Sequence, residues 1–588
     1  MRPAARLRLA APGPALPAVL AALALFVLLA FGPRALQGGG TGDPATAAGA
    51  TAAGASDAQA DPEVPVLVVG ITVDQLRPDY FHRYAEHLGE GGFRRLLDEG
   101  FFFRNGHFRH STTATGPGHA AQFTGGTPSV HGLVGNGWYV RELGRSINVI
   151  EAVDSGFQAV GAREGTDGEK GPQNMLTTTF GDELFLHTGE RSRTVSISRK
   201  DRGAILPGGH TGHAYWYEGG TGNFITSTFY RDELPDWLVA FNDRNLAQEY
   251  LTRVWEPLHP IETYVESRAD DNPYEGRIGG STAFPFDLAR LVEEEGAGPS
   301  LLNTTPFGDE LLFELAYAAI EGEELGRGPV PDVLALGLSA TDAIGHRFGP
   351  ASKQMQDHIL RLDAYLADFL DYLDREFGQE NVLVFLTSDH GAVYVPHYLR
   401  DLGVRTGHPD NETQVAGRIG QALEAWMEEE YGASFVEALA GNGLFLDHDF
   451  LRSEGLDLEA VRADVKRKLL TLDGIGGALT ADALNRTEFT QPPRSAIQAA
   501  FHQKRSGDIL LWLEPQTSAG TGTGGTGHGS PWTYDRHVPI VFWGFQVPAG
   551  ESSEPVYVSD IASTVSIYLK SPFPSGNVGR PLNDLMGR

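Results

Sequence analysis

Cysteine is absent from the chain of 588 residues. Its absence excludes a disulfide bridge, a thiolate zinc site, an iron–sulfur cluster and a cysteine nucleophile. It does not exclude export, because proteins outside the cytoplasm can form disulfides but do not require them. If the chain has a nucleophile, that nucleophile belongs to another residue type.

Positive charge is also scarce. Lysine and arginine number 46 against 76 aspartates and glutamates, which gives a net charge of -30. This balance argues against binding nucleic acid or an anionic membrane surface through a broad basic patch. An anionic substrate would therefore need a strong local positive charge, such as that of metal ions.

Long apolar runs are rare, and the clearest one lies at the N-terminus. The uncharged stretch "ALPAVLAALALFVLLAFG" at 15–32 follows Arg2, Arg6 and Arg8. This pattern is typical of a signal peptide or signal anchor, which we assign to residues 1–36, although a buried core helix is an alternative. The run is near the minimum length for spanning a bilayer, and no A-x-A cleavage site follows it directly.

The N-terminal pattern also predicts where the protein is located. By the positive-inside rule, the rest of the chain lies outside the cytoplasm, either periplasmic or extracellular. An uncleaved segment would serve as a membrane anchor. Residues 37–62 are rich in glycine, alanine, threonine and aspartate, which is typical of a flexible spacer. A catalytic domain is then expected over residues 63–588.

Three apolar runs end in acidic or imidazole side chains. "VPVLVVGITVD" ends at Asp74, "VPDVLALGLSATD" ends at Asp342, and "NVLVFLTSDHG" delivers Asp389 and His390. Continuous apolar runs suit strands that are buried on both faces of a parallel sheet. Sheets of this kind bind ligands at the carboxyl ends of their strands. The runs therefore predict a shared site at one edge of the sheet.

Helical segments lie between these runs. "DHILRLDAYLADFLDYLDREFG" at 357–378 has apolar residues at three- and four-residue spacing, and Gly378 suits a helix C-terminus. The alternation predicts an α/β fold with a doubly wound, mostly parallel central sheet and helices on both faces. The acidic, helix-rich stretch 403–487 is expected to be an inserted cap. The chain returns to strands near Ile509 and Val541, joined by a loop of glycine and threonine.

Three carboxylates and three imidazoles form the candidate metal set. Carboxylate and imidazole donors without sulfur suit two zinc ions, or zinc with another divalent metal. Two zinc ions would outweigh three carboxylates by about one positive charge, which would draw a phosphate into an acidic protein. The six residues are Asp74, Asp342, His346, Asp389, His390 and His528.

Each member of this set also has a simpler role. Asp342 and His346 could form a salt bridge, Asp74 could cap a helix, and His528 could be a solvated loop histidine. Three strands that all end in such groups are harder to explain in this way. The joint pattern therefore favours metal binding.

The stretch "STTATGPGHA" at 111–120 raises a separate question. Its Gly-Pro-Gly turn requires neither Thr115 before it nor His119 after it. If Pro117 lies in the first turn of a helix, Thr115 lies at or just before the N-cap and could simply cap it. Alternatively, Thr115 is a nucleophile, because a helix N-terminus stabilises an anion and a nearby metal ion would lower the pKa of its hydroxyl. The residues alone leave both roles open.

Seven short motifs, in their order along the chain, resemble those of a known protein family. They are "VDQLRPDY", "TGPGHA", "GLVGNGWY", "SRKDRGAILPGGH", "TDAIGHRFGP", "TSDHG" and "GTGHGSPWTYDRHVPIVFWG". Together they resemble the alkaline phosphatase superfamily over about residues 64–588. The nearest likeness is to bacterial alkaline phosphatases with a threonine nucleophile, the PafA-like group, which are related to nucleotide pyrophosphatases/phosphodiesterases.

The resemblance implies two zinc ions beside a nucleophile. Thr115 would form a phosphothreonine intermediate and would contact one of the metal ions. That metal ion would be bound by Asp74, Asp389 and His390, and the other by Asp342, His346 and His528.

The resemblance also implies phosphate contacts. Asn136, Lys200 and Arg202 would contact the non-bridging oxygens of the phosphate. Lys200 and Arg202 are two residues apart, so on a strand or extended loop both could face the same way. An exposed basic pair is the alternative. Their charge would favour a monoester dianion over a diester, and His119 would support the site without binding the metal.

These observations predict a metal-dependent phosphate monoester hydrolase that acts on small-molecule phosphate esters and not on nucleic acid. A nucleotide pyrophosphatase/phosphodiesterase with the same metals is the main alternative. A sulfatase would need a C/S-x-P-x-R motif, whereas this motif begins at Thr115 and ends at His119. A non-catalytic binding protein of this fold would have lost a ligand or the nucleophile, and none is lost. Manganese or cobalt in a metal site, and the oligomeric state, are left open.

Overall fold

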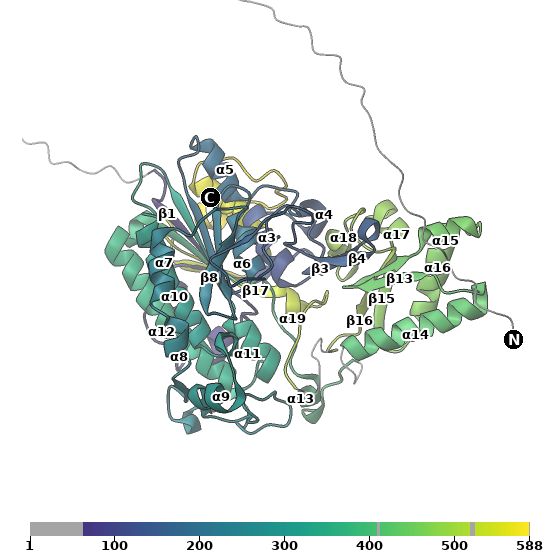
Figure 1. The fold of residues 1–588 in the computed structure, drawn as a ribbon, viewed down its shortest axis with the longest axis horizontal. Coiled ribbons are helices and arrows are strands. Elements are labelled where there is room, and N and C mark those ends of the chain that lie inside the picture. Colours follow the sequence, from purple (N-terminus) through teal and green to yellow (C-terminus); the bar gives the residue numbers. More distant parts are fainter. Residues whose placement is uncertain (1–62, 408–411, 518–523, 587–588) are drawn as a thin grey trace, which may run out of the picture. The chain divides into compact units, whose positions relative to one another are not determined.

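The computed structural model describes residues 63–407, 412–517 and 524–586 (Figure 1). The signal segment expected at 1–36 and the spacer expected at 37–62 lie outside these residues. Among the described residues, no helix is both long and apolar enough to cross a membrane.

An eleven-stranded mixed sheet forms the centre of the described chain. Its central strands β12, β1, β11, β6 and β7 are parallel, while β17 and β8 run antiparallel to them. The three predicted apolar runs form neighbouring strands at 67–73, 332–338 and 382–387, which confirms the α/β class. The order is β18 (Gly550–Ser552), β2 (Phe101–His107), β17 (His537–Gly544), β12 (Val382–Thr387), β1 (Leu67–Val73), β11 (Asp332–Leu338), β6 (Thr194–Ser198), β7 (His213–Glu218), β8 (Asn223–Ser227) and β5 (Ala159–Val160), with β19 (Val556–Tyr557) also paired to β2.

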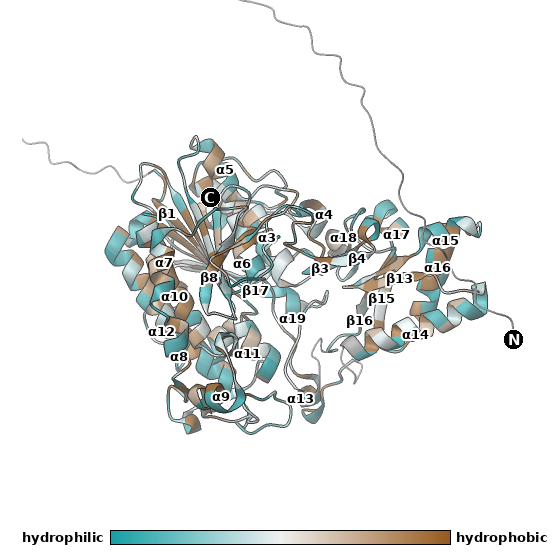
Figure 2. Cartoon of the chain, in the orientation of Figure 1, coloured by the Kyte–Doolittle hydropathy of each residue, from teal (hydrophilic) through white to brown (hydrophobic). Residues whose placement is uncertain are grey.

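Helices cover both faces of this sheet (Figure 1). On β1, Leu67 and Val69 join the apolar core that includes α10 (Phe307–Gly322) and α12 (Lys353–Phe377). Val68 joins the opposite core, with α3 (Thr115–Thr124), α5 (Phe180–His187) and α20 (Asp560–Tyr568). Because both faces are buried, β1, β11 and β12 are apolar at almost every position, and Figure 2 shows apolar residues in the strands of the central sheet.

The predicted helix at 357–378 is α12, and it begins four residues earlier, at Lys353. The hydroxyl of Ser352 accepts the backbone N–H of Met355 at 3.1 Å and so caps the helix. Its C-terminus is as expected, since Gly378 follows with a φ of 81°. The other helices are α1 (Tyr80–Arg83), α2 (Phe93–Glu99), α4 (Pro128–His131), α6 (Asp201–Gly208), α7 (Asp236–Asp243), α8 (Leu246–Tyr250), α9 (Leu288–Glu295), α11 (Ala340–Phe348), α13 (Pro396–Asp401) and α19 (Thr533–Arg536).

A second, four-stranded antiparallel sheet has its own apolar core. The stretch 403–487 supplies three of its strands, and the strand near Ile509 also belongs here, between β14 and β15, rather than to the central sheet. We call residues 412–513 the cap. The cap contains β13 (Val436–Ala440), β14 (Gly443–Leu446), β15 (Ile475–Thr480), β16 (Ile509–Leu513), α14 (Glu412–Tyr431), α15 (His448–Ser453), α16 (Leu458–Leu469), α17 (Ala481–Arg486) and α18 (Arg494–Ala500).

One buried carboxylate, Asp508, joins the cap to a hairpin formed by β3 (Gly137–Val140) and β4 (Arg145–Asn148). It accepts hydrogen bonds from Arg462 Nη2 at 2.6 Å and from Arg141 Nη2, on the hairpin side, at 2.5 Å. His448 Nε2 lies 2.7 Å away and the N–H of Leu446 donates at 2.8 Å. Burial alone would raise the pKa of Asp508, but these partners hold it below its ordinary value.

Replacement of Asp508 by asparagine is expected to destabilise the protein by about 3 kcal/mol, because the two arginines lose a buried counter-charge. Since the folded-state pKa is depressed, this loss should be full at neutral pH and should shrink as the pH falls below ~4. Denaturant unfolding at several pH values measures it. Asp449→Asn is the control, because that carboxylate is 90% exposed and its ion pair contributes less than about 1 kcal/mol. Equal losses in the two variants would contradict a joining role for Asp508.

Candidate active site

The carboxyl ends of three adjacent strands place the candidate metal donors. Asp74 directly follows β1, and Asp389 and His390 follow β12 after one intervening residue. Asp342 and His346 lie one turn apart on α11, which begins after β11. Because β1 pairs in parallel with both β11 and β12, all three ends meet at one edge of the sheet. His528 reaches the same edge from the loop before β17.

The donors form two tight groups, within each of which the ligand atoms lie no more than 4.8 Å apart. One group is Asp74, Asp389 and His390, as the resemblance implies. The other is Asp342, His390 and His528, so His390 belongs to both. His346, expected in the second group, instead lies at its border, with Nε2 3.1 Å from Asp342 Oδ1.

Backbone carbonyls orient the three imidazoles. The Nδ1 atoms of His346, His390 and His528 lie 2.9, 3.0 and 2.7 Å from the carbonyl oxygens of Thr526, Gly391 and Thr113. A carbonyl oxygen accepts a hydrogen bond but cannot donate one, so each Nδ1 carries a proton. In the neutral form of each ring, Nε2 is then left with a lone pair that can bind a metal ion.

The pKa values of these imidazoles differ with their surroundings. Burial lowers the pKa of His390 and that of His528, which keeps both rings neutral. The adjacent Asp342 carboxylate raises the pKa of His346 to about 9. His346 is therefore the one imidazole of the set that must lose a proton before it can bind a metal ion.

Several buried donor atoms have no hydrogen-bond partner among the described residues. They are Asp74 Oδ1, Asp389 Oδ2 and His390 Nε2. Burial, with Asp74 close by, raises the pKa of Asp389 well above its ordinary value. An unpaired buried polar group costs roughly 1–3 kcal/mol, so these atoms are poorly explained without a cation. Their oxygen and nitrogen chemistry fits divalent metal ions such as zinc.

Thr115 is the first residue of α3, and Ala114 is the N-cap. It therefore lies one residue later than the expected capping position, and its hydroxyl caps nothing. The side chain is buried, and its Oγ1 lies 3.3 Å from Lys200 Nζ and 3.5 Å from Arg202 Nη2. A hydroxyl at a helix N-terminus beside two cations is placed to react with an anion.

Close packing fixes α3 against the metal donors. A Cβ atom on Gly118 would lie 2.3 Å from the carbonyl oxygen of Asp389 and 2.7 Å from its Cβ. Only glycine allows this approach. The Gly-Pro-Gly sequence therefore serves to bring Thr115 to the donors as well as to start the helix.

Lys200 and Arg202 differ from the expected strand or extended loop. Lys200 is the N-cap of α6 and has an extended backbone, while Arg202 lies in the first helical turn. Both nevertheless reach Thr115, whereas Asp201 between them pairs with Lys170 at 2.8 Å and lies 3.9 Å from Arg202 Nη1. Lys200 Nζ also lies 2.5 Å from Asp74 Oδ2 and 2.7 Å from Asp342 Oδ2. Its ammonium thus bridges carboxylates of the two metal-donor groups.

Asn136 and His119 contact the start of α3. The side-chain carbonyl of Asn136 accepts the backbone N–H of Gly116 at 2.7 Å. His119 Nδ1 lies 2.9 Å from the carbonyl oxygen of Thr115 and 3.5 Å from Asp389 Oδ2. Burial lowers the pKa of His119 to about 4, so the ring is neutral. His119 thus links Thr115 to a candidate metal donor.

Two residues that the sequence analysis missed hold the donors in place. Gln75 donates its backbone N–H to Asp389 at 3.1 Å and its side-chain amide to Asp342 at 2.7 Å. Its φ of 66° is uncommon for a residue with a side chain. Asp309 accepts the two backbone N–H groups at the start of α11, each at 3.0 Å. The one available signal was that Gln75 directly follows Asp74.

The chain matches the model of the type I phosphodiesterase / nucleotide pyrophosphatase family over residues 68–538. The chain belongs to this family. It is 38% identical over 528 residues to alkaline phosphatase PafA of Elizabethkingia meningoseptica, covering 89% of this chain and 95% of the relative. It is also 38% identical over 525 residues to alkaline phosphatase PhoV of Synechococcus elongatus, covering 89% and 93% of the two chains.

A solved structure extends this comparison within the family. The crystal structure of wild-type alkaline phosphatase PafA matches with a TM-score of 0.83 at 36% identity, covering 89% of this chain and 99% of that one. The resemblance to the PafA-like group drawn from seven short motifs is therefore confirmed. The alkaline-phosphatase-like α/β fold is confirmed with it.

Proposed function

We propose that this chain is a metal-dependent phosphate monoester hydrolase, an alkaline phosphatase, that acts on small-molecule phosphate esters. One observation carries the proposal. The hydroxyl of Thr115 lies at a helix N-terminus, 3.3 Å from Lys200 Nζ and 3.5 Å from Arg202 Nη2, beside a cluster of metal donors. The names of the relatives PafA and PhoV, both alkaline phosphatases, support the same activity.

The reaction at Thr115 would proceed in two steps. Thr115 Oγ1 gives up its proton to water and attacks the phosphorus atom in line with the leaving oxygen, so the Oγ1–P bond forms as the ester P–O bond breaks. The leaving alkoxide takes a proton from water and departs as an alcohol. A water molecule then cleaves the phosphothreonine, releasing inorganic phosphate and restoring the threonine hydroxyl.

Charge around Thr115 stabilises the transferred group. Lys200 and Arg202 would face the oxygens of a phosphoryl group on Thr115, and the positive end of the α3 dipole would add to their charge. Asn136 fixes the start of α3, because its side-chain oxygen accepts the backbone N–H of Gly116 at 2.7 Å. Bound divalent ions would add positive charge that lowers the pKa of the Thr115 hydroxyl and neutralises the leaving oxygen.

The metal assignment rests on the donor chemistry and the resemblance. We assign two zinc ions per chain, one to Asp74, Asp389 and His390, and the other to Asp342 and His528 with His346. Oxygen and nitrogen donors alone also accept manganese or cobalt, so zinc is the favoured metal rather than the only one that fits.

The N-terminal sequence supports export. Residues 1–36, with their arginines before an apolar run, would direct the rest of the chain to the periplasm or the cell exterior. Residues 63–588 would then form the catalytic domain, with an insertion around 403–487.

The family name also covers a second candidate, a phosphodiesterase or nucleotide pyrophosphatase. A diester carries one negative charge on its phosphoryl oxygens where a monoester carries two. Two cationic side chains lie within 3.5 Å of Thr115 Oγ1. They stabilise the second negative charge of a phosphate monoester, which favours the monoester as substrate.

Steady-state hydrolysis of p-nitrophenyl phosphate beside bis-p-nitrophenyl phosphate tests the proposal, with bound metal counted on the same sample. We expect two metal ions per chain and a large preference for the monoester. A preference for the diester would move the protein to the phosphodiesterase alternative with the same nucleophile. A metal-free, inactive protein would refute the enzyme assignment.

A further inference from the structure

The loop that carries His528 takes its shape from contacts with other segments. His528 lies between Gly527 and Gly529 in the sequence "GGTGHG" at 524–529, and Gly529 has a φ of 112°. Glycine is freer than any other residue in the unfolded chain, so local preference does little to fix a histidine with glycine on both sides. The position of this imidazole is therefore set by residues elsewhere.

Thr113 contacts three successive residues of this loop. Its carbonyl oxygen accepts a hydrogen bond from Nδ1 of His528 at 2.7 Å. Its hydroxyl accepts the backbone N–H of Gly529 at 3.2 Å and donates to the carbonyl oxygen of Ser530 at 3.1 Å. Thr113 is 0% exposed, so its hydroxyl is committed to these two partners.

The same residue lies close to the candidate nucleophile along the chain. Thr113 comes two residues before Thr115, the first residue of α3. At the other end of its contacts, Nε2 of His528 lies 3.6 Å from Asp342 Oδ1, and the His528 ring stacks on that of His390 with 3.5 Å between centroids. Thr113 thus connects the segment that carries Thr115 to one group of metal donors.

We infer that Thr113 is a positioning residue for the metal ion that we assign to Asp342, His346 and His528. Its carbonyl sets the ring orientation of His528, and its hydroxyl holds the backbone that follows, so that Nε2 stays beside Asp342. Thr113 is not itself a member of either donor group. The inference rests on the proposed function, because it takes His528 as a metal ligand.

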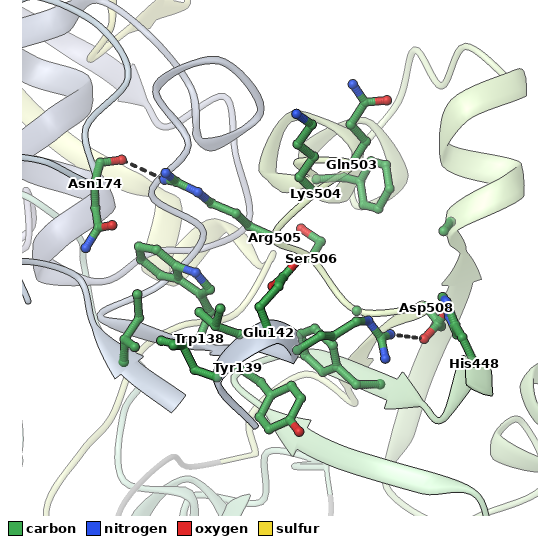
Figure 3. A pocket seen from close by; sticks show the side chains of 18 of the residues that line it. Trp138, Tyr139, Glu142, Asn174, His448, Gln503, Lys504, Arg505, Ser506 and Asp508 are labelled. Atoms are coloured by element: carbon green, nitrogen blue, oxygen red, sulfur yellow. Dashed lines mark hydrogen bonds and ion pairs between the residues drawn. The ribbon is translucent and has the colours of Figure 1, made fainter. Parts of the chain in front are cut away.

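Other contacts should keep the loop and the cap folded when the Thr113 hydroxyl is removed. Asn442, in the turn between β13 and β14, donates its side-chain N–H to the carbonyl oxygen of Gly529 at 3.2 Å. The cap is also joined to the rest of the chain away from this loop. Arg505 Nη1 donates to the carbonyl oxygen of Asn174 at 2.6 Å, beside the cavity between the hairpin β3–β4 and the cap (Figure 3).

Thr113→Val tests the inference, because it removes the hydroxyl and keeps the branched shape and the carbonyl. Zinc is titrated into the metal-free full chain, with a chelator of known affinity as competitor. We expect two zinc ions per chain in the parent. In the variant one of them should bind about tenfold more weakly or worse, since loss of an outer partner of a metal ligand typically costs roughly 10–100-fold in affinity. The other zinc ion should bind as in the parent.

A serine variant and a neighbouring threonine serve as controls. Thr113→Ser keeps the hydroxyl and should restore most of the lost affinity. Thr112→Val changes the adjacent threonine, whose hydroxyl forms no hydrogen bond with the described residues, and should bind both zinc ions as the parent does. The unfolding midpoint of each variant, measured beside the titration, shows that the variant is folded.

Amide hydrogen exchange of the metal-free parent gives a second measurement, which requires no variant. The backbone N–H of Gly529 is bonded to the Thr113 hydroxyl. It should therefore exchange about tenfold more slowly than an unprotected amide, or slower still, and Thr113→Val should lose this protection. Rapid exchange of the Gly529 amide in the parent would overturn the inference.

Unchanged affinity for both zinc ions in Thr113→Val, or equal weakening of both, would overturn the positioning role of Thr113 and leave the proposed function standing. A parent that binds no zinc would overturn the proposed function, and the positioning role with it. The titration of the parent therefore separates the two failures.

Discussion

Thr115→Ala is expected to lower monoester turnover by about 10³-fold or more, because the chemistry loses its nucleophile. The metal content should remain close to that of the parent, since all six candidate donors are other residues. The Thr115 side chain is buried, and among the described residues the hydrogen-bond partners of its hydroxyl are Lys200 and Arg202. Steady-state kinetics on p-nitrophenyl phosphate with metal analysis of the same samples would measure both effects.

Two further variants make this result specific. Thr115→Ser keeps a hydroxyl at the same position and should recover much of the activity lost in the alanine variant. Thr112→Ala removes a threonine three residues earlier, on the loop before α3, and should leave turnover nearly unchanged. Full activity in Thr115→Ala would show that the nucleophile is wrongly assigned, whereas loss of metal would show that the variant reports on assembly of the site.

Lys200→Ala is expected to lower monoester turnover by roughly 10²–10³-fold, the usual cost of removing one preorganised donor from a developing anion. Diester turnover should fall much less, because a diester presents one negative charge fewer to the missing ammonium. The ratio of the two losses is the informative quantity, and kcat/KM for both substrates gives it.

The structure supplies a close control for Lys200. Lys170 lies nearby but pairs with Asp201, and among the described residues it forms no hydrogen bond with Thr115. Lys170→Ala should change monoester and diester turnover little and alike. Equal losses of both substrates in Lys200→Ala would remove the physical argument for monoester preference. Metal analysis is needed here too, because Lys200 also bridges Asp74 and Asp342.

The central strands could be predicted from sequence because burial on both faces requires apolar residues at nearly every position. β1, β11 and β12 all read this way, and their neighbouring ends followed from parallel pairing. The strand near Ile509 reads the same, yet it lies in the cap sheet. An apolar run shows that a strand is buried but not which sheet it joins, since that depends on distant partners.

The candidate site could also be predicted only in part. Residue type and position at strand ends identified the donors, but not how they group: His390 serves both groups and His346 lies at the border of one. That division depends on side-chain orientation set by carbonyls of Thr113 and Thr526, far away in sequence. The role of Gln75 was hidden for the same reason, because both of its partners are distant.

The contacts of the hairpin β3–β4 bear on how this enzyme family can diverge. Just before the hairpin, the side chain of Asn136 accepts the backbone N–H of Gly116. At the tip of the hairpin, Arg141 donates a hydrogen bond to Asp508 of the cap. A cap grafted from another family member would have to present a carboxylate to Arg141, or the hairpin that supports the nucleophile helix would lose its outer anchor. The cap and the start of α3 are thus coupled through the hairpin, and an exchanged cap without this carboxylate is expected to weaken that coupling.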